Sequence, residues 1–483
     1  MNHKINEIEP QEVWRCFSAL NAVPRASKKE EKVIDFMVQF AKELDLSVAV
    51  DAVGNVLVKK PATLGMENKK TVVMQAHLDM VHQKNNDTEF DFDKQGIDMY
   101  VDGDWVRARG TTLGADNGLG VAAIMAVLAS KDIVHPALEA LFTIDEETGM
   151  TGAMGLQGGW LQGQILLNLD TEEDDEIGVG CAGGVDVTAF GQFDDEPNHL
   201  NGGFEISVTG LQGGHSGMEI HKGLGNANKL MNRILWALDE QVVLSKLHGG
   251  SLRNAIPRES VAIIAVAQEQ RDQVQKVFDQ VRSSILEEYK HLEPELSLTL
   301  DPCAAPARVM SQADQKIFLS AVQGTFNGVY RMSPAIEGLV ETSNNVAKVT
   351  LDQGQIQIDC LTRSSVDSSK EDLTNSLSAV FGLAGYQVRY AGTYPGWAPN
   401  MDSPILKVME GLYCDIFGQQ PNVAACHAGL ECGILGQNYP DLDMISFGPT
   451  IKGAHSPDER ASISSTQKFW RFLKAVLAEI PQA

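Results

Sequence analysis

Histidines and acids follow short apolar runs at four widely separated places in the 483-residue chain. The runs, which we predict to be buried strands, are 71–75, 138–144, 165–169 and 444–447. The residues that come after them include His77, Glu147, Asp170 and His455, and a fifth candidate, Asp116, opens an apolar helix at 118–129. Because ligands bind outside the carboxyl ends of strands in open α/β sheets, we expect all five side chains to meet in one crevice.

This set of two imidazoles and three carboxylates suits zinc, manganese or cobalt better than calcium or magnesium. Three of the ligands would hold one ion. All five, with one carboxylate shared, would hold two ions about 3.5–4 Å apart, an arrangement that polarises a carbonyl group and generates hydroxide near neutral pH. The pattern therefore predicts a metal-dependent hydrolase.

Two further acids have the spacing of supporting residues. Asp79 lies two residues after His77 and could accept the second N–H of its imidazole, which would fix the tautomer of the ring. Glu146 precedes the ligand Glu147 and is the candidate general base that deprotonates the attacking water. A single acid after a strand is usually a cap or a loop residue, and Asp116 also fits an ordinary N-cap. However, potential metal ligands at four strand ends and one helix start are unlikely to occur together by chance.

Strands that alternate with helices around these residues predict an α/β fold, with a mixed sheet flanked by helices. Amphipathic helices are expected at 30–44 and near the C-terminus, where Ser464 and Ser465 are candidate caps. The middle of the chain repeats one order of strands and helices. We therefore expect a catalytic domain split into 1–185 and 392–483, and an inserted α+β lid at 186–391. Its halves, 186–302 and 303–391, would be a duplicated βαββαβ-type unit.

Composition and charge exclude several classes of protein. The 64 acids exceed the 39 lysines and arginines and give a net charge of −25, which argues against nucleic-acid and anionic-membrane partners. No apolar stretch is long enough to span a bilayer, no signal peptide is apparent, and seven scattered cysteines fit reduced thiols, so we expect a cytoplasmic protein. The run 178–183 matches G-x-G-x-x-G, but a predicted strand follows it, which argues against a nucleotide site. The acids at 172–176 are interpreted as a solvated loop.

Six motifs together resemble the co-catalytic zinc amidohydrolases, a family that includes peptidase T, carboxypeptidase G and the aminoacylases. They lie in the family's order over nearly the whole chain, at 77–79, 114–118, 145–149, 169–170, 214–217 and 453–457. Each motif alone is weak, whereas six in order are specific. Within this family, the residues at 110–118 and 429–433 and the long insertion are similar to enzymes that cut unblocked dipeptides ending in histidine.

The resemblance implies a role for each candidate. Two Zn²⁺ ions per subunit, replaceable by Co²⁺ or Mn²⁺, would be bound, one by His77, Asp116 and Asp170 and the other by Asp116, Glu147 and His455. Asp116 would bridge the ions and would precede a cis peptide bond. Glu146 would be the base, and Asp79 would orient His77. In the lid, His215 would stabilise the oxyanion, and Asn254, Arg363 and Gly429 would bind the carboxylate of the dipeptide.

The expected activity is hydrolysis of unblocked dipeptides, preferentially Xaa-His and including β-alanyl-histidine. An N-acyl amino acid deacylase and a tripeptide aminopeptidase are the alternatives within the family. A metal-binding protein without activity is the alternative outside it, but such a protein has no need of Glu146 beside Glu147. Relatives with a small lid often dimerise through it, so a homodimer is a further expectation, and whether His215 acts within its own chain stays open.

Overall fold

The computed structural model describes residues 4–483, and the chain divides into two compact units. Unit 1 comprises Met1–Gly180, Trp397–Ala425 and Leu430–Ala483, and unit 2 comprises Cys181–Gly396 and Cys426–Gly429. The sequence predicts boundaries at 185/186 and 391/392, and nothing in it indicates that the four residues 426–429 belong with the inserted unit.

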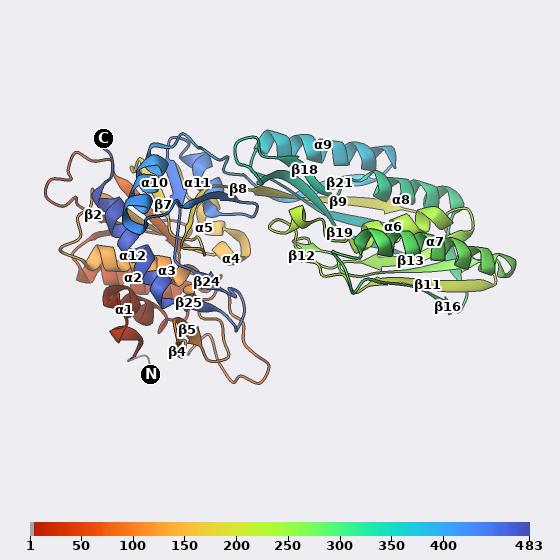
Figure 1. Ribbon diagram of the computed structural model, residues 1–483, viewed down its shortest axis with the longest axis horizontal. Coiled ribbons are helices and arrows are strands. Elements are labelled where there is room, and N and C mark those ends of the chain that lie inside the picture. Colours follow the sequence, from red (N-terminus) through yellow and green to blue (C-terminus); the bar gives the residue numbers. More distant parts are fainter. Residues whose placement is uncertain (1–3) are drawn as a thin grey trace. The chain divides into compact units, whose positions relative to one another are not determined.

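Unit 1 is built on a mixed eight-stranded sheet with the order β1-β2-β6-β3-β7-β23-β8-β22 (Figure 1). The strands are β1 (Ser47–Val50), β2 (Val56–Lys60), β3 (Val72–His77), β6 (Leu138–Thr143), β7 (Ile165–Asn168), β8 (Glu176–Cys181), β22 (Asn422–Cys426) and β23 (Asp443–Ser446). The central strands β6, β3, β7 and β23 run parallel, and every residue of β3, β6 and β7 is buried. Parallel strands that are covered on both faces have continuous apolar sequences. For this reason the central strands could be predicted from the sequence. The predicted α/β fold with a mixed sheet is confirmed.

The helices of unit 1 come from both the N-terminal and the C-terminal part of the chain. They are α1 (Gln11–Leu20), α2 (Glu31–Glu43), α3 (Ala115–Ala129), α4 (Glu146–Gly149), α5 (Thr151–Gly155), α10 (Pro404–Phe417), α11 (Glu431–Asn438) and α12 (Ile463–Ala478). The predicted caps of α12 are wrong, because the Ser462 side chain caps this helix by accepting a hydrogen bond from the Ser465 N–H at 3.1 Å. Among the residues from 4 onward, no helix has the length and hydropathy needed to cross a membrane.

A small four-stranded sheet with the order β24-β25-β5-β4 was not predicted. It consists of β4 (Met99–Asp102), β5 (Trp105–Ala108), β24 (Ile451–Lys452) and β25 (Arg460–Ser462). The loop between β24 and β25 carries His455 and Glu459. This sheet therefore fixes both ends of a loop that bears a candidate ligand.

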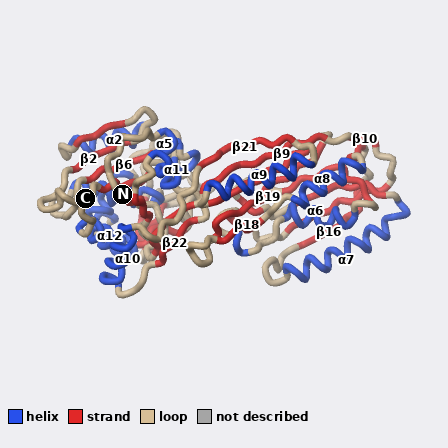
Figure 2. The backbone as a smooth tube through the Cα atoms, turned by 90° about the horizontal axis from the view of Figure 1, so that it is seen from above, coloured by secondary structure: helices blue, strands red, loops and turns tan. Residues whose placement is uncertain are grey.

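Unit 2 is built on an antiparallel sheet with helices along one face (Figure 2). The order along the sheet is β16-β11-β15-β13-β19-β20-β9-β21, and β18 also pairs with β19. Its elements are β9 (Gly183–Gln192), β11 (Gly202–Thr209), α6 (Ala227–Leu238), β13 (Val242–Gly249), β15 (Ser260–Val266), α7 (Arg271–Tyr289), β16 (Ser297–Cys303), α8 (Gln312–Gly324), β18 (Gly328–Met332), β19 (Val340–Asp352), β20 (Gln355–Ser364), α9 (Asp367–Leu383) and β21 (Gln387–Tyr394), with short strands β10 (Asp195–Pro197), β12 (Gly214–His215), β14 (Ala255–Ile256) and β17 (Arg308–Met310). Alternate strand residues such as Ile206, Ile264 and Ile358 share one core with the helices, as in a sheet covered on one face.

The strands of unit 2 form two sets with the same order. One set runs β11-α6-β13-β15-α7-β16 along the chain, and the other runs β9-α8-β19-β20-α9-β21. In each set the first strand lies between the third and the fourth in the sheet. Strand β9 thus pairs with β20 and β21, whereas the division at 302/303 placed it in the first half. Strand β9 precedes the first set in the chain but belongs to the second set in the sheet, and the order of elements along the chain does not show this. A common origin of the two sets stays a prediction.

Candidate metal centre

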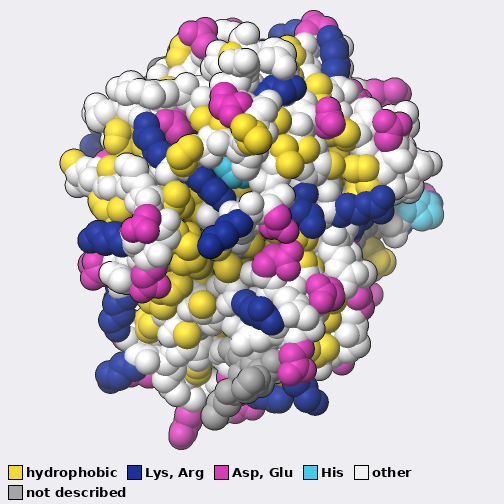
Figure 3. All heavy atoms as spheres, turned by 90° about the vertical axis from the view of Figure 1, so that its left-hand side faces the viewer, with side chains coloured by type: hydrophobic (Ala, Val, Ile, Leu, Met, Phe, Trp, Pro, Cys, Tyr) yellow, Lys and Arg dark blue, Asp and Glu magenta, His cyan; other side chains and the backbone are white. Residues whose placement is uncertain are grey.

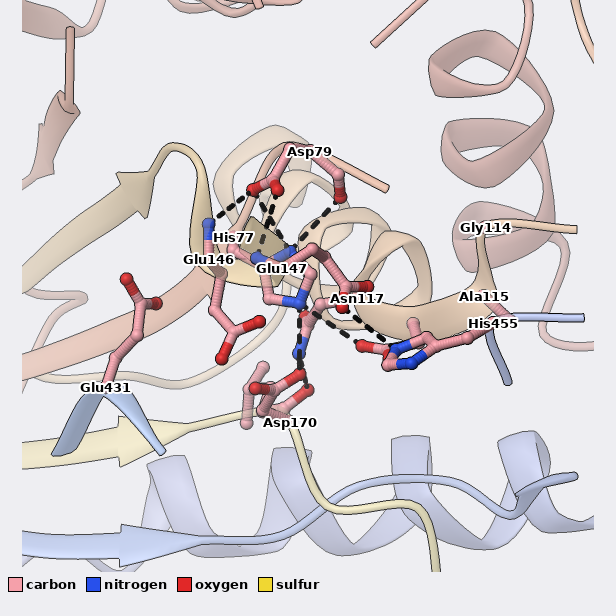
Figure 4. A network of polar contacts seen from close by, with 12 residues as sticks. His77, Asp79, Gly114, Ala115, Asn117, Glu146, Glu147, Asp170, Glu431 and His455 are labelled. Carbon is pink, nitrogen blue, oxygen red and sulfur yellow. Dashed lines mark hydrogen bonds and ion pairs between the residues drawn. The ribbon is translucent and has the colours of Figure 1, made fainter. Parts of the chain in front are cut away.

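The first group of candidate ligands lies at the carboxyl ends of β3 and β7. His77 is the last residue of β3, and its Nε2 lies 3.2 Å from Asp116 Oδ1 and 3.6 Å from Asp170 Oδ1 (Figure 4). These three side chains offer ligand atoms that all lie within 4.8 Å of one another. Asp116 enters from the start of α3, where the Asp116–Asn117 peptide bond is cis.

The second group shares Asp116 with the first. His455 Nε2 lies 3.1 Å from Asp116 Oδ2 and 2.9 Å from Glu147 Oε2. The two oxygens of Asp116 therefore face different histidines, Oδ1 toward His77 and Oδ2 toward His455. Two groups of three donors that share one carboxylate are the arrangement that a pair of bridged metal ions requires.

The charges in this cluster are those of a cation site. Burial raises the pKa of Asp170 to about 6, with the charges of Asp116 and Glu147 adding to the shift. Hydrogen bonds to Asp116 and Glu147 raise the pKa of His455 to about 11. Burial lowers the pKa of His77, but Asp170, Asp116 and Asp79 outweigh it and hold the pKa well above its usual range. The carboxylates thus favour positive charge beside both imidazoles.

The chemistry of the donors fits a pair of divalent cations. Imidazole nitrogens and carboxylate oxygens in sets of three are the ligands that zinc and similar ions take in hydrolases. Glu147 Oε1 is buried and has no hydrogen-bond partner among the described residues, as expected of an atom reserved for a ligand.

Asp79 ties the first group to the loop that carries Glu146 and Glu147. His77 Nδ1 lies 3.1 Å from the Asp79 carbonyl oxygen and 3.4 Å from Asp79 Oδ1. The Asp79 carboxylate also accepts hydrogen bonds from the Glu146 N–H at 3.0 Å, the Glu147 N–H at 3.3 Å and the Ser27 hydroxyl at 2.8 Å. Burial alone would raise the pKa of Asp79, but these donors and His77 lower it. The acid is placed to orient the imidazole and the loop together.

Glu146 lies beside the ligands without belonging to either shared group. Its carboxyl oxygen, with His77 and Glu147, forms a further cluster of donor atoms within 4.8 Å. Burial raises the pKa of Glu146 well above its usual range, and the charges of Asp170, Glu431 and Glu147 raise it further against the effect of His77. A carboxyl group with a raised pKa next to a candidate metal pair has the properties of a general base.

Two buried residues that the sequence does not reveal, Glu459 and Arg25, hold the turn before Asp116. The Glu459 carboxylate accepts four backbone N–H groups, from Leu113 (2.7 Å) and Gly114 (2.9 Å) on Oε2 and from Ala115 (2.7 Å) and Asp116 (3.3 Å) on Oε1.

The fully buried Arg25 also holds this turn. Its guanidinium donates to the carbonyl oxygens of Leu78 (3.0 Å), Asp79 (3.1 Å) and Gly114 (2.6 Å). Gly114 adopts a φ of 70°, and a Cβ atom there would lie 2.5 Å from Arg25 Nη2, so the glycine is required by both conformation and space. Arg25 and Glu459 both lie outside any periodic pattern of apolar residues. The one signal in the sequence is that Glu459 comes four residues after His455.

Two other residues near the ligands have roles that the sequence does not indicate. The Asn117 side-chain amide donates to the Leu169 carbonyl oxygen at 3.0 Å and to Asp170 Oδ1, and so orients that ligand. The sequence predicts that Glu172 lies in a solvated acidic loop, and the structure shows that its side chain is partly buried there. Burial and the charges of Asp116 and Asp170 raise the pKa of Glu172 to about 8, which places its carboxyl group within the electrostatic field of the site.

The remaining candidates lie together in unit 2. His215 pairs with Ala255 across β12 and β14, and the Ser216 N–H donates to the Asn254 carbonyl oxygen at 2.8 Å. The Gly217 and Met218 N–H groups donate to His215 Nδ1 at 3.2 and 3.0 Å. Burial and Arg363 lower the pKa of His215 to about 4. The neutral ring therefore carries its proton on Nε2, where it is free to donate.

Arg363 lies within β20 and donates to the Tyr394 hydroxyl at 2.9 Å. Its Nε is buried and has no partner among the residues described. The next candidate, Gly429, follows in the segment 426–429, whose His427 bonds the Ser343 hydroxyl through Nε2 at 2.8 Å. His427 was not identified from the sequence. A Cβ on Gly217 would lie 2.1 Å from the His427 carbonyl oxygen, so this segment packs directly on the loop after His215.

Comparison with known proteins gives consistent matches over nearly the whole chain. The model of peptidase family M20/M25/M40 matches residues 73–479. The chain is 46% identical over 483 residues to the Escherichia coli cytosol non-specific dipeptidase, covering 99% of both chains. The crystal structure of aminoacylhistidine dipeptidase from Vibrio alginolyticus matches with a TM-score of 0.93 and 45% identity, covering 99% of this chain and 98% of that one. Aminopeptidase PepT from Bacillus cereus, at 15% identity and a TM-score of 0.58 over 98% of this chain and 99% of that one, shares the fold.

Proposed function

Because the chain belongs to peptidase family M20/M25/M40, we propose that it is a cytosolic metallodipeptidase that cuts unblocked dipeptides, including those with a C-terminal histidine. The observation that carries this proposal is the pair of ligand groups that share Asp116. The two relatives that match at 45–46% identity over the full length are a cytosol non-specific dipeptidase and an aminoacylhistidine dipeptidase, and their names supply the substrate class and the location.

Membership of the family implies a dinuclear metal centre, and we propose that both ions are Zn²⁺. His77, Asp116 and Asp170 would hold one ion, and Asp116, Glu147 and His455 the other. When bound, such a pair lowers the pKa of water and polarises the peptide carbonyl group. Cobalt and manganese accept the same donors and are the substitutes we expect.

Glu146 is the proposed general base. Its carboxyl group lies beside His77 and Glu147 but outside the two shared groups, so it is free to accept a proton. It would take the proton of the attacking water and deliver it to the amine of the departing amino acid. Asp79 would keep the base in position through the Glu146 N–H, since the same carboxylate also holds the His77 ring.

The residues of unit 2 would recognise the rest of the substrate. His215, neutral and protonated on Nε2, is the proposed donor to the oxyanion of the tetrahedral intermediate. Arg363, whose buried Nε has no partner among the described residues, would bind the terminal carboxylate together with Asn254 and Gly429. A charged clamp on that carboxylate fixes the distance between the C-terminus of the substrate and the bond that is cut.

The test is a substrate panel on purified protein with its metal content measured in parallel. We expect about two zinc ions per chain and turnover of β-alanyl-histidine and of other unblocked dipeptides. N-acetylated amino acids and tripeptides should be poor substrates. Preference for either of those would replace the dipeptidase with the corresponding alternative in the family. A homodimer, the remaining expectation, is tested by sedimentation of the same sample.

A further inference from the structure

The segment 253–255 of unit 2 carries Asn254, which we propose to bind the substrate carboxylate, and it lies outside the main sheet of the unit. Ala255 begins the short strand β14, which pairs with the equally short β12, where His215 lies opposite Ala255. Two strands of two residues each form too few hydrogen bonds to be stable on their own. Contacts with the rest of unit 2 must therefore determine where Asn254 stands.

The side chain of Asn345 makes the most direct of these contacts. Asn345 is buried in β19, and its Nδ2 donates to the carbonyl oxygens of Arg253 at 3.1 Å and Ala255 at 2.8 Å. The carbonyl oxygen between them, that of Asn254, accepts the Ser216 N–H at 2.8 Å. Three successive carbonyl groups are thus hydrogen-bonded, two of them to one amide. Because a carbonyl oxygen can only accept, these bonds also determine which end of the amide is Nδ2.

The other end of the Asn345 amide is also bonded. Asn226 Nδ2 lies 3.4 Å from Asn345 Oδ1, and it donates as well to Asn327 Oδ1 at 2.9 Å and to the Val346 carbonyl oxygen at 3.1 Å. A buried amide is costly unless its polar atoms are bonded, and here both ends have partners. The amide is therefore held in one orientation, with its NH₂ group directed at the segment 253–255.

Asn345 connects this segment to the strand that carries Arg363. Strand β19 pairs with β20, where Asn345 lies opposite Leu361, two residues before Arg363. The Arg253 guanidinium bonds the same strand, donating to one of its backbone carbonyl oxygens at 3.0 Å. Two donors that bind one carboxylate must keep a fixed separation, because a misplacement of about 1 Å is costly. The β19–β20 pair is a rigid support to which both Arg363 and Asn254 are fixed.

We propose that Asn345 is a positioning residue for Asn254: its amide holds the segment 253–255 on the β19–β20 pair, so that Asn254 and Arg363 can bind the same carboxylate. Because this segment also pairs with β12, Asn345 fixes the place of His215 as well. The roles of Asn254, Arg363 and His215 rest on the proposed function. The hold of Asn345 on the segment rests on its hydrogen bonds alone.

Hydrogen exchange of the Ser216 N–H, measured on the full chain, tests whether Asn345 holds the segment. Leucine is similar to asparagine in size but donates no hydrogen bond, so Asn345→Leu frees both carbonyl groups of the segment. The Ser216 N–H, which bonds the carbonyl oxygen between them, should then lose protection by about tenfold or more. Wild-type protection of this N–H in Asn345→Leu would overturn the proposal. The measurement needs no enzyme activity.

The matched control is Asn344→Leu. Asn344 is buried like its neighbour, but successive strand residues point to opposite faces, and its side chain bonds other groups. It donates to the Phe326 carbonyl oxygen at 2.7 Å and accepts from the Thr362 hydroxyl at 2.9 Å. Asn344→Leu therefore removes a buried amide of the same strand without touching the segment 253–255. Protection of the Ser216 N–H should stay within about threefold of the wild type, and a fall equal to that in Asn345→Leu would overturn the proposal.

Kinetics on β-alanyl-histidine test the consequence for the substrate. Asn345→Leu should raise KM about tenfold or more and lower kcat, since His215 moves with the segment, whereas Asn344→Leu should keep both within about threefold. A general loss of stability would affect the two variants alike. An unchanged KM in Asn345→Leu, or equal changes in the control, would overturn the proposal.

A double variant shows whether Asn345 acts through Asn254. In the Asn254→Ala background, Asn345→Leu should change KM by less than about twofold, because the group that it positions is already absent. Losses that multiply would overturn the proposal. If Asn345→Leu does not fold, Asn345→Thr keeps one donor in place of two, and wild-type protection and KM in that variant would overturn it equally. Inactive wild-type protein, or a wild-type KM in Asn254→Ala, would refute the proposed function and leave the exchange measurement to decide on Asn345.

Discussion

The four hydrogen bonds to Glu459 predict that a single amide substitution will loosen the turn that carries Asp116. Glu459 is buried, and each carboxylate oxygen accepts two consecutive backbone N–H groups between Leu113 and Asp116. Glu459→Gln keeps an acceptor for one pair and presents its own NH₂ group to the other. Two buried N–H groups then lose their acceptor, at about 1–3 kcal/mol each, so opening of the turn becomes easier by about 3 kcal/mol.

Hydrogen exchange measured on the full chain reports this change at the site itself. A shift of about 3 kcal/mol in the opening equilibrium lowers the protection of the amides at 113–116 by about two orders of magnitude. Asp458→Asn is the matched control, because Asp458 is exposed in the same loop and its substitution should change protection very little. Zinc content should fall in Glu459→Gln and stay unchanged in the control. Wild-type protection at 113–116 in Glu459→Gln would refute the conclusion that this carboxylate holds the turn.

Four further substitutions test the roles assigned to single residues. Glu146→Ala should leave the zinc content intact and lower kcat by about a hundredfold or more, and undiminished turnover would remove the base assignment. Asp116→Ala should release both ions together in metal analysis, and retention of either would argue against a shared ligand. Arg363→Met should raise KM for dipeptides by about ten- to hundredfold with little change in kcat, and an unchanged KM would exclude the carboxylate clamp. Burial, with the charges of Arg363 and His215, lowers the pKa of His427 to about 3, so the unfolded chain binds the proton more tightly and stability falls as the pH drops below about 6.5. Between about pH 7 and pH 5 the wild type should lose about 2 kcal/mol more stability than His427→Gln in denaturant titrations, and equal losses would contradict a buried neutral imidazole.

The elements that carry the ligands could be predicted because two signals coincide in them. The central strands are covered on both faces and are therefore apolar throughout, and the residues at their carboxyl ends belong to the few types that bind metals. Parallel strands end at one edge of the sheet, so His77 and Asp170 could be placed together without knowing the strand order. The shared position of Asp116 followed from the family resemblance, and its two oxygens do face opposite histidines.

The residues that support the ligands could not be predicted, because their function depends on burial. Arg25 and Glu459 are charged residues in irregular segments and resemble surface residues in the sequence. Strand pairing was equally inaccessible, because β9 joins the second set of strands only in the folded sheet.

The net charge of −25 also gave no indication of where the acids gather. Figure 3 shows a face of the molecule on which acidic and basic side chains are interspersed. The acids that matter for the proposed chemistry are the partly buried ones, whose carboxyl groups meet at the ends of strands. A surface charge count cannot separate these from the rest.

Anomalous diffraction from crystals of the zinc-loaded protein tests the central claim most directly. We predict two peaks in the difference map at the zinc edge, one near Asp116 Oδ1 with His77 and Asp170, and one near Asp116 Oδ2 with Glu147 and His455. A single peak, or peaks that do not share Asp116, would contradict the bridged centre on which the proposed hydrolysis depends.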